Sequence, residues 1–283
     1  MMDTQKMPPA VRAAAVMDLS GFGRCSLTVA LPILSVMGVQ LSCLPTAVLS
    51  THTGGFTGYT FRDLTGDMRP FFTHWQKEGL TFDALYIGYL GSEEQIAIVQ
   101  DFVKAFRGKD TLVLVDPVMG DHGRLYSRFT DRMADGIRQL CAQADVIVPN
   151  MTEAAFLTGT PYLEGRCSPD AAAELCGRLL ALGTKNVVLT GVMPQKGRMG
   201  AACRAGDSFS LYAPRRVPAQ YDGTGDVFAS TLLGALLRGK ALPAACRLAC
   251  DFTRDCVALS SHRGTNMHHG VDFEPLLYKL AKK

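Results

Sequence analysis

Short apolar runs that alternate with stretches of helical periodicity constrain the fold of this chain more than any other feature. The runs predict strands at residues 13–17, 39–50 (broken at Pro45), 84–90, 112–115, 146–148 and 186–189. Apolar residues between them recur at three- and four-residue spacing, which predicts helices at 26–37, 61–77, 93–106, 131–141, 152–157 and 169–182. Such alternation favours a mostly parallel sheet with helices on both faces, a three-layer α/β/α sandwich.

The pattern changes after Val192. Residues 200–205 and 208–213 predict a small antiparallel hairpin with a two-residue turn between its strands. The rest of the chain predicts a helix after a glycine-rich turn, a helix at 243–259 and a short helix after Asp272. Because no linker and no internal repeat interrupts the sequence, we expect one domain over residues 1–283.

Composition narrows the classes of function. The net charge of +3 is slight and the basic residues are scattered, which argues against a nucleic-acid partner. The apolar run near the N-terminus, residues 11–17, is too short to span a membrane. The nine cysteines form no C-x-x-C pair, which indicates reduced thiols in a cytoplasmic protein. Only Cys25, in the first loop, is a candidate for a position near a ligand.

Polar residues and glycines follow the ends of the predicted strands. The carboxyl ends of parallel strands share one edge of a sheet, where ligands bind in such folds. We therefore expect the active face at this edge, formed by Asp18, residues 51–55, 88–89, 116–121, 150–153 and 190–191.

The segment from Gly223 to Ser230 (GTGDVFAS) reads as a glycine-rich turn that leads into a helix. The free N–H groups of a first helical turn can receive an anion. Asp226 would be out of place in a simple phosphate site, but it could take a proton from a hydroxyl that attacks a phosphoryl group held by those N–H groups. The alternative interpretation is an ordinary helix cap.

Two further carboxylate motifs have a functional and a structural interpretation. Asp116 and Asp121 flank a turn stiffened by Pro117, and such a pair could hold hydrated Mg²⁺ beside nucleotide phosphates. Thr152 is predicted to cap the next helix with Glu153 in its first turn. In the structural interpretation, these side chains only cap backbone N–H groups.

Residues 51–55 (THTGG) combine hydroxyls, an imidazole and flexible backbone, which would suit a small, polar, aromatic substrate. Tyr89 could stack on the ring of such a substrate. A surface turn and a tyrosine at the edge of the core are the alternatives.

The order of these motifs is more specific than any one of them. From residue 13 to about 274, the chain carries D-x-S-G-x-G, S-T-H-T-G, G-Y, D-P-V-M-G-D, P-N-x-T-E-A, V-V-L-T-G and G-T-G-D-x-F. In this order it resembles the ribokinase-like superfamily and, within it, the vitamin B6 kinases, which phosphorylate pyridoxal, pyridoxine and pyridoxamine.

The resemblance implies roles for individual residues. Asp226 would be the catalytic base, with Gly223, Thr224 and Gly225 as the anion hole. Further site residues fall into three groups: Asp18, Ser20, Thr53 and Tyr89 for the substrate; Asp121, Tyr126, Asn150, Glu153, Thr190, Gly191 and Thr224 for the nucleotide; and Asp121 and Glu153 for a metal ion held through water. The implied cofactors are ATP and Mg²⁺, with K⁺ or another monovalent cation as a further candidate, and the implied assembly is a homodimer.

One residue departs from the B6 kinase pattern. Those kinases usually carry a serine at the end of the first strand, whereas this chain has Asp18, and D-x-S-G-x-G is closer to the hydroxymethylpyrimidine kinases of thiamin synthesis. Hydroxymethylpyrimidine (phosphate) kinase is therefore the second hypothesis, and a non-catalytic ligand-binding regulator on the same fold is the third. We also expect the helix N-terminus to lower the pKa of Asp226 below the value that burial alone would give it.

Overall fold

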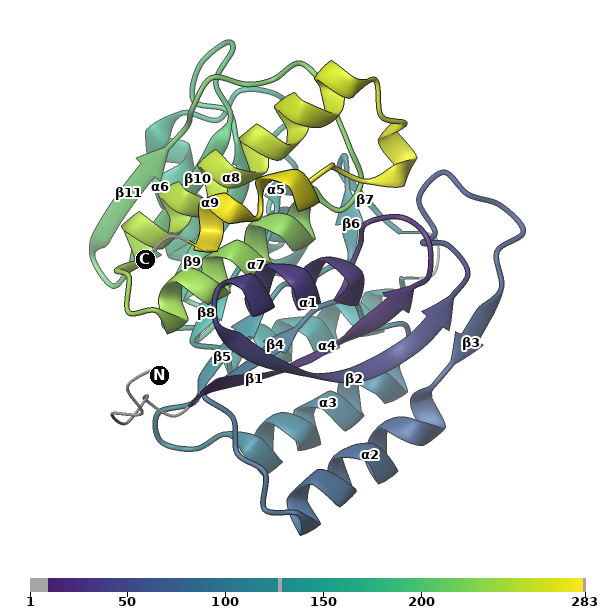
Figure 1. Cartoon of the computed structure of the whole chain (residues 1–283). Coiled ribbons are helices and arrows are strands. Elements are labelled where there is room, and N and C mark those ends of the chain that lie inside the picture. The colour runs from purple at the N-terminus through teal and green to yellow at the C-terminus, as the bar shows by residue number, and fades with distance from the viewer. Residues whose placement is uncertain (1–9, 127–128, 282–283) are drawn as a thin grey trace, which may run out of the picture.

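A nine-stranded sheet forms the centre of the molecule (Figure 1). The computed structural model describes residues 10–126 and 129–281. The strands lie in the order β11-β10-β9-β8-β5-β4-β1-β2-β3. Their bounds are Val11–Ser20 (β1), Val39–Leu49 (β2), Phe61–Asp63 (β3), Ala84–Ile87 (β4), Leu112–Val115 (β5), Val146–Ile147 (β8), Asn186–Val192 (β9), Gly200–Ala205 (β10) and Ser208–Tyr212 (β11).

The six strands from β9 to β2 in the spatial order pair in parallel, and only the edges are antiparallel. β3 joins one edge beside β2, and the hairpin β10–β11 joins the other beside β9. A separate two-stranded ribbon consists of β6 (Gly120–Asp121) and β7 (Arg124–Leu125). The mostly parallel sheet and the small antiparallel hairpin are both confirmed.

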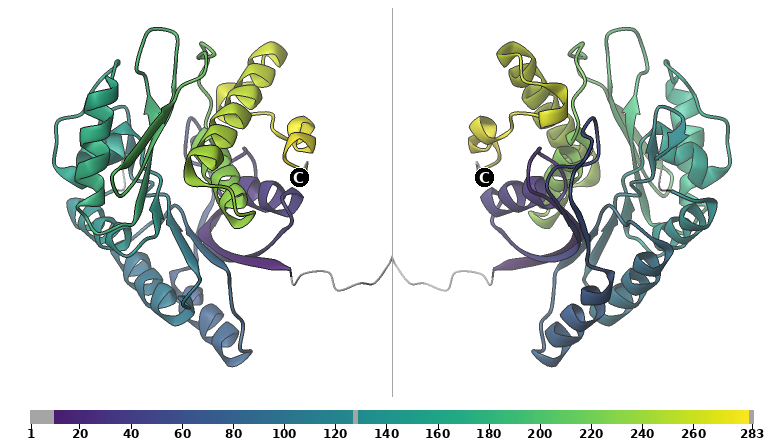
Figure 2. Two further views of the ribbon diagram at one scale, coloured as in Figure 1. Left: turned by 90° about the vertical axis from the view of Figure 1, so that its left-hand side faces the viewer. Right: turned by 90° about the vertical axis from the view of Figure 1, so that its right-hand side faces the viewer.

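Helices cover both faces of the sheet, as the edge-on views in Figure 2 show. One face packs against α2 (Thr65–Lys77), α3 (Glu93–Phe106), α4 (Asp131–Ala142), α5 (Met151–Thr158) and α6 (Pro169–Leu180). The other packs against α1 (Leu27–Val36), α7 (Thr224–Leu237), α8 (Leu242–Arg263) and the short α9 (Tyr278–Ala281). Each face therefore has its own apolar core, because strand residues alternate between the two faces. The three-layer α/β/α sandwich is confirmed.

Two local predictions were wrong. β2 continues through Pro45, and the irregularity follows it, since Met17 pairs with Pro45 but Leu19 with Val48. The segment 61–77 is not helical throughout, because Phe61–Asp63 pairs with β2 as an edge strand before α2 begins. Within α2, Phe72 is buried whereas Phe71 is 43% exposed.

Two findings bear on the class of protein. Among residues 10–126 and 129–281, no helix combines the length and the apolar character that crossing a membrane requires. All nine cysteines lie within these ranges, and all are free thiols.

Candidate active site

The turn before α7 leaves backbone N–H groups available to a ligand. Gly223 is the N-cap in a left-handed conformation (φ 74°), and within the described chain no side chain caps this helix. A Cβ at Gly223 would collide with the Arg24 carbonyl, so the turn requires glycine. A Cβ at Gly225 would meet nothing within 4 Å, which leaves open space beside the first turn. This is the geometry of an anion-binding helix N-terminus.

Asp226 lies in that first turn and is half-buried. The pKa of its carboxyl is raised to about 7, chiefly by burial. A hydrogen bond from the Ser26 backbone N–H opposes this shift, and the nearby charge of Asp18 adds to it. The net shift is upward, so the lowering expected from the helix N-terminus does not outweigh burial. Desolvation disfavours the charged form more strongly than the local donors favour it.

Asp18, near the end of β1, is buried beside Asp226. Its two carboxylate oxygens accept hydrogen bonds from the hydroxyls of Ser20 (2.9 Å) and Ser26 (2.6 Å). Burial raises the pKa of Asp18, although both hydroxyls oppose the shift. Ser20 is thus occupied in orienting Asp18, and the pair lies next to the proposed base.

Ser26 connects the two acids and was not predicted. It adopts a positive φ of 50°, which is uncommon for a residue other than glycine. In this conformation its backbone N–H donates a hydrogen bond to the Asp226 carboxylate, and its hydroxyl donates one to the Asp18 carboxylate. Nothing in the spacing of the sequence indicates this role, because it depends on two segments that are far apart in the chain. Backbone strain of this kind is characteristic of functional sites.

Cys25 does lie near the site, as the sequence suggested. Burial and the charges of Asp226, Asp18 and Asp222 raise its pKa well above the ordinary value. The side chain is therefore a neutral thiol at physiological pH and is not poised as a nucleophile.

Asp116 and Glu153 form a second pair of buried acids below the site. Burial raises the pKa of each carboxyl, and the charge of Asp226 raises that of Asp116 while Asp116 raises that of Glu153. The Glu153 oxygens also accept backbone N–H bonds from Met119 (3.2 Å) and Asn150 (2.8 Å). Asp116 directly ends the apolar strand β5, so the sequence did carry a signal for it, although the resemblance assigned the role to Asp121.

Asp121 lies apart from these acids. Its side chain is 55% exposed in the β6–β7 ribbon, where it accepts the backbone N–H of His122 (2.8 Å). Tyr126, which follows the ribbon, is 44% exposed, and its pKa is raised by burial and by the charges of Glu153, Asp121, Asp116 and Asp226. Both residues are therefore exposed to solvent, whereas Asp116 and Glu153 are buried.

Asn150, and not Thr152, is the N-cap of α5. The Asn150 side-chain oxygen accepts N–H bonds from Thr152 (2.8 Å) and Glu153 (2.9 Å), and its amide group donates to the Gly120 carbonyl (2.9 Å). Thr152 instead accepts the N–H of Gly123 (2.9 Å). Thr152 was the wrong cap because the helix begins at Met151, so Asn150 takes the N-cap position.

Thr190 and Gly191 lie in β9 beside this cap. The Thr190 hydroxyl donates to the Pro149 carbonyl (3.3 Å), and Gly191 has a positive φ of 74°. The two residues therefore share one end of the sheet with α5 and with the N-terminus of α7.

The loop after β2 packs against the C-terminal segment. His52 is buried: its Nδ1 accepts the N–H of Gly54 (3.1 Å), so its Nε2–H donates to the His268 carbonyl (2.6 Å). His268 in turn bonds Asp222 (3.0 Å), which immediately precedes the turn of α7. Thr53, the predicted substrate residue, is exposed next to this buried histidine.

Tyr89 follows β4 and is half-buried against the core on the α3 side of the sheet. Its backbone carbonyl accepts a bond from the Thr46 hydroxyl (3.4 Å). It therefore lies at the same edge of the sheet as Asp18, the edge at which β1 and β4 end.

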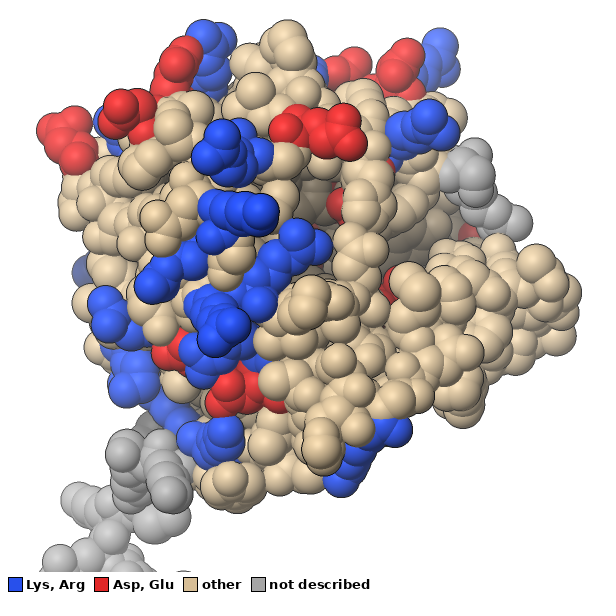
Figure 3. All heavy atoms as spheres, turned by 90° about the horizontal axis from the view of Figure 1, so that it is seen from above, with Lys and Arg blue, Asp and Glu red and all other residues tan. Residues whose placement is uncertain are grey.

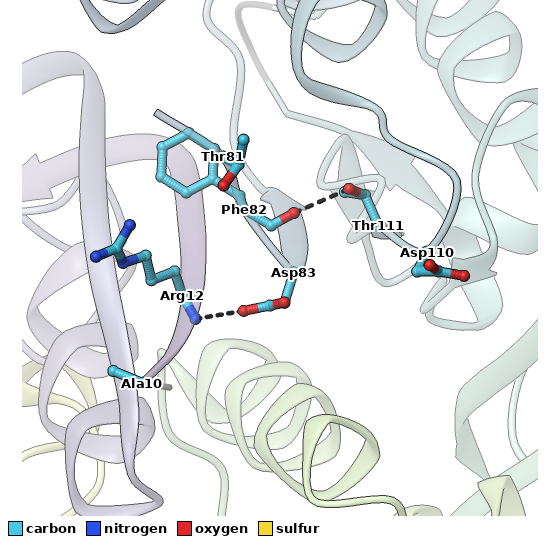
Figure 4. Close-up of a pocket in the computed structure, with 7 residues that line it drawn as sticks. All are labelled: Ala10, Arg12, Thr81, Phe82, Asp83, Asp110 and Thr111. Carbon is cyan, nitrogen blue, oxygen red and sulfur yellow. Dashed lines mark hydrogen bonds between the residues drawn. The ribbon is translucent and has the colours of Figure 1, made fainter. Parts of the chain in front are cut away.

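The two ends of the sheet differ in their chemistry. Seen from above, the molecule is hollowed, acidic atoms are visible inside the hollow, and lysines and arginines gather on the surface beside it (Figure 3). At the opposite end, where the strands begin, a cavity of about 340 Å³ is lined by Arg12, Asp83, Asp110 and neighbours (Figure 4). There Asp83 accepts the Arg12 backbone N–H (2.7 Å), which is a structural contact.

Comparison with known proteins finds kinases of small molecules. The family model described as phosphomethylpyrimidine kinase matches residues 73–272. A pyridoxine/pyridoxal/pyridoxamine kinase of Bordetella avium is 32% identical over 238 residues, which cover 78% of this chain and 76% of the relative.

Two solved structures are similar over nearly the whole chain. A candidate phosphomethylpyrimidine kinase of Bacteroides thetaiotaomicron, crystallised with pyridoxal, is 38% identical with a TM-score of 0.88, covering 96% of both chains. The pyridoxal kinase of Lactobacillus plantarum is 34% identical with a TM-score of 0.88, covering 95% of this chain and 96% of that one.

Proposed function

The chain belongs to the phosphomethylpyrimidine and pyridoxal kinase family of ribokinase-like phosphotransferases, and from this premise we propose its substrate and mechanism. We propose that it transfers the γ-phosphoryl group of ATP to the 5′-hydroxymethyl group of pyridoxal, pyridoxamine or pyridoxine. Pyridoxal in the crystal of the Bacteroides relative supports this substrate class.

One observation carries the mechanism: an acid with a pKa of about 7 lies in an uncapped helix N-terminus. A base of that pKa is matched to proton transfer near neutral pH. Asp226 accepts the proton of the substrate hydroxyl as its oxygen attacks phosphorus. The N–H groups of residues 223–226 hold the transferring phosphoryl oxygens, so catalysis is mainly positioning and electrostatics.

The buried acids fit a divalent cation. Burial makes both Asp116 and Glu153 costly to ionise, the charge of Asp226 adds to the cost for Asp116, and that of Asp116 adds to the cost for Glu153. A nearby cation would relieve this cost. Among the described residues, no three acidic, histidine or cysteine side chains are gathered closely enough to hold a metal directly. We propose that Glu153 and Asp116 hold Mg²⁺ through water, with the exposed Asp121 further out. Bound there, Mg²⁺ would neutralise phosphate charge.

The nucleotide would extend from the N-terminus of α7 toward the ends of β9 and α5. Thr190, Gly191 and Thr224 present backbone and hydroxyl groups along this path, and Tyr126 lies on its rim. The Asn150 side chain is occupied by its cap, so we propose that it acts on the nucleotide by shaping the loop. The basic surface beside the hollow would attract a polyanion (Figure 3).

A second candidate substrate is hydroxymethylpyrimidine or its phosphate, and Asp18 is the residue that favours it. Its carboxylate is buried, held by Ser20 and Ser26, and faces the same site as Asp226. It could accept a hydrogen bond from a ring N–H, a 3-hydroxyl or an amine. Comparing kcat/KM on the three B6 vitamers and on hydroxymethylpyrimidine separates the candidates: we expect a B6 vitamer to have the highest value.

We further propose that residues 1–283 act as one kinase domain, as a homodimer, in the cytoplasm. The nine free thiols support a reducing compartment. Light scattering of the purified protein tests the dimer, and a monomeric mass would exclude it.

The decisive experiment is Asp226→Asn in an ATP-consumption assay with pyridoxal. Loss of a general base typically lowers the rate by about 10²–10⁴, so we expect turnover to be nearly abolished while ATP binding persists. Asp170→Asn is the matched control, because Asp170 is also in a first helical turn but is exposed on α6.

Normal turnover by Asp226→Asn would refute the mechanism. A wild-type protein that binds pyridoxal but consumes no ATP would instead support the third hypothesis, a non-catalytic regulator.

A further inference from the structure

Two buried hydroxyls beneath the site lack partners. Tyr86 on β4 and Ser230 on α7 have no solvent exposure. Within residues 10–126 and 129–281, neither side-chain oxygen has a hydrogen-bond partner. Most buried polar groups in native proteins are paired, often through an enclosed water, so two neighbouring exceptions need an explanation.

The fold places both hydroxyls directly below the proposed base. Tyr86 pairs with Leu114 of β5, and Asp116, two residues further on, is expected on the same face of the sheet. Ser230 follows Asp226 by four residues, so the two lie on the same side of α7. Burial raises the pKa of Tyr86 well above its ordinary value, and the charges of Asp116 and Asp226 raise it further. The Ser230 hydroxyl lowers it, because it lies close to the Tyr86 hydroxyl although the two are poorly aligned for a hydrogen bond. The four side chains are therefore neighbours.

The surroundings give no structural reason for the hydroxyls. The apolar side chains around them come from the sheet, α1, α7 and α8. Two other buried hydroxyls on these helices, those of Thr231 and Ser260, donate to carbonyls of their own helix. Phenylalanine and alanine would fill the same positions without an unpaired oxygen. A water molecule between Tyr86, Ser230 and the carboxylates above would have the two to four polar partners that an enclosed water needs.

We propose that Tyr86 and Ser230 are positioning residues for the base: they hold one enclosed water that hydrogen-bonds the Asp226 carboxylate from below. The Ser26 N–H holds that carboxylate from another side. With both anchors the carboxylate keeps the orientation that the attacking hydroxyl requires. The inference rests on the proposed role of Asp226.

The test compares Tyr86→Phe, Ser230→Ala and the double variant, with kcat and the KM values for ATP and pyridoxal as readouts. Loss of one such hydrogen bond should lower kcat about tenfold and leave both KM values unchanged. The double variant should be no slower than the slower single variant, because both hydroxyls act through the same water. Thr253→Val is the control: its hydroxyl, on α8, is also buried without a partner.

Wild-type kcat in both single variants, with an equal or higher melting temperature, would overturn the proposal and show two merely unpaired hydroxyls. Failure of the proposed function is distinguishable, because it would appear as retained turnover in Asp226→Asn. A crystal structure of the wild-type protein provides a second readout that does not depend on the variants. A water between the two hydroxyls supports the inference, and a dry contact there overturns it.

Discussion

Asp226 lies in the first turn of α7. The helix N-terminus favours the charged carboxylate there, whereas burial disfavours it. Burial decides the balance, and Asp18 adds to it. The pKa of about 7 means that near neutral pH the carboxyl is divided between its two forms. A group with this value can accept a proton during reaction and release it afterwards.

The same shift predicts a pH-dependent gain of stability in Asp226→Asn. The folded pKa of about 7 exceeds the ordinary value of 3.8, so the folded protein binds this proton more tightly than the unfolded chain. That stabilisation is complete below pH 4 and is lost as the pH rises through 7. The variant has no such proton. Its free energy of unfolding should therefore rise relative to that of the wild type between pH 4 and pH 7, by at most roughly 4 kcal/mol.

Urea unfolding of both proteins at pH 4, 6 and 8 measures this difference. The other buried acids titrate in both proteins and largely cancel. A difference in the free energy of unfolding that is constant with pH would contradict the raised pKa.

At the scale of elements, α5 shows how a helix end can shape a site without contacting the substrate. Asn150 and Glu153 form a reciprocal capping box, and Asn150 also bonds the Gly120 carbonyl at the start of the β6–β7 ribbon. The cap thus holds Glu153 in place and fixes the ribbon that carries Asp121. An N-terminal cap of this kind contributes about 0.5–2 kcal/mol.

We therefore expect Asn150→Ala to destabilise the protein by about 1–2 kcal/mol and to raise the KM for ATP. Asn150→Ser should lose less stability, because serine can still cap the helix. It cannot replace the hydrogen bond that the Asn150 amide donates to the Gly120 carbonyl. Chemical unfolding and steady-state kinetics measure the two effects. Equal losses of stability in both variants would show that the bond to Gly120, and not the cap, is the important contact.

On the scale of the whole molecule, the C-terminal segment ties together loops that lie far apart in the sequence. Arg24, in the loop after β1, forms ion pairs with Asp272 (2.9 Å) and Glu274 (2.7 Å), and its backbone N–H bonds His269 (3.2 Å). The Arg24 carbonyl packs against Gly223 of the anion turn. The turn is therefore held in place by contacts between the first and last parts of the described chain.

Arg24→Met should destabilise the protein by about 1–3 kcal/mol, between the values for exposed and buried ion pairs, because Asp272 is buried. It should also lower kcat/KM, since the anion turn loses support. Arg69→Met is the matched control, because Arg69 pairs with Asp101 (2.8 Å) but both side chains are exposed. Thermal unfolding should show that the control loses less than about 1 kcal/mol of stability. Similar losses of stability in the two variants would contradict a role for the buried Asp272.

The sequence alone determined the layers of the fold, the small antiparallel hairpin and the turn that carries Asp226. Each of these depends on residues close together in the chain: alternating apolar runs, a two-residue turn and glycines before a helical pattern. The tertiary structure decided the rest. It buried Asp116 and exposed Asp121, set Ser26 between two acids and raised the pKa of Asp226. Burial and charge proximity arise between distant segments, so local patterns could not specify them.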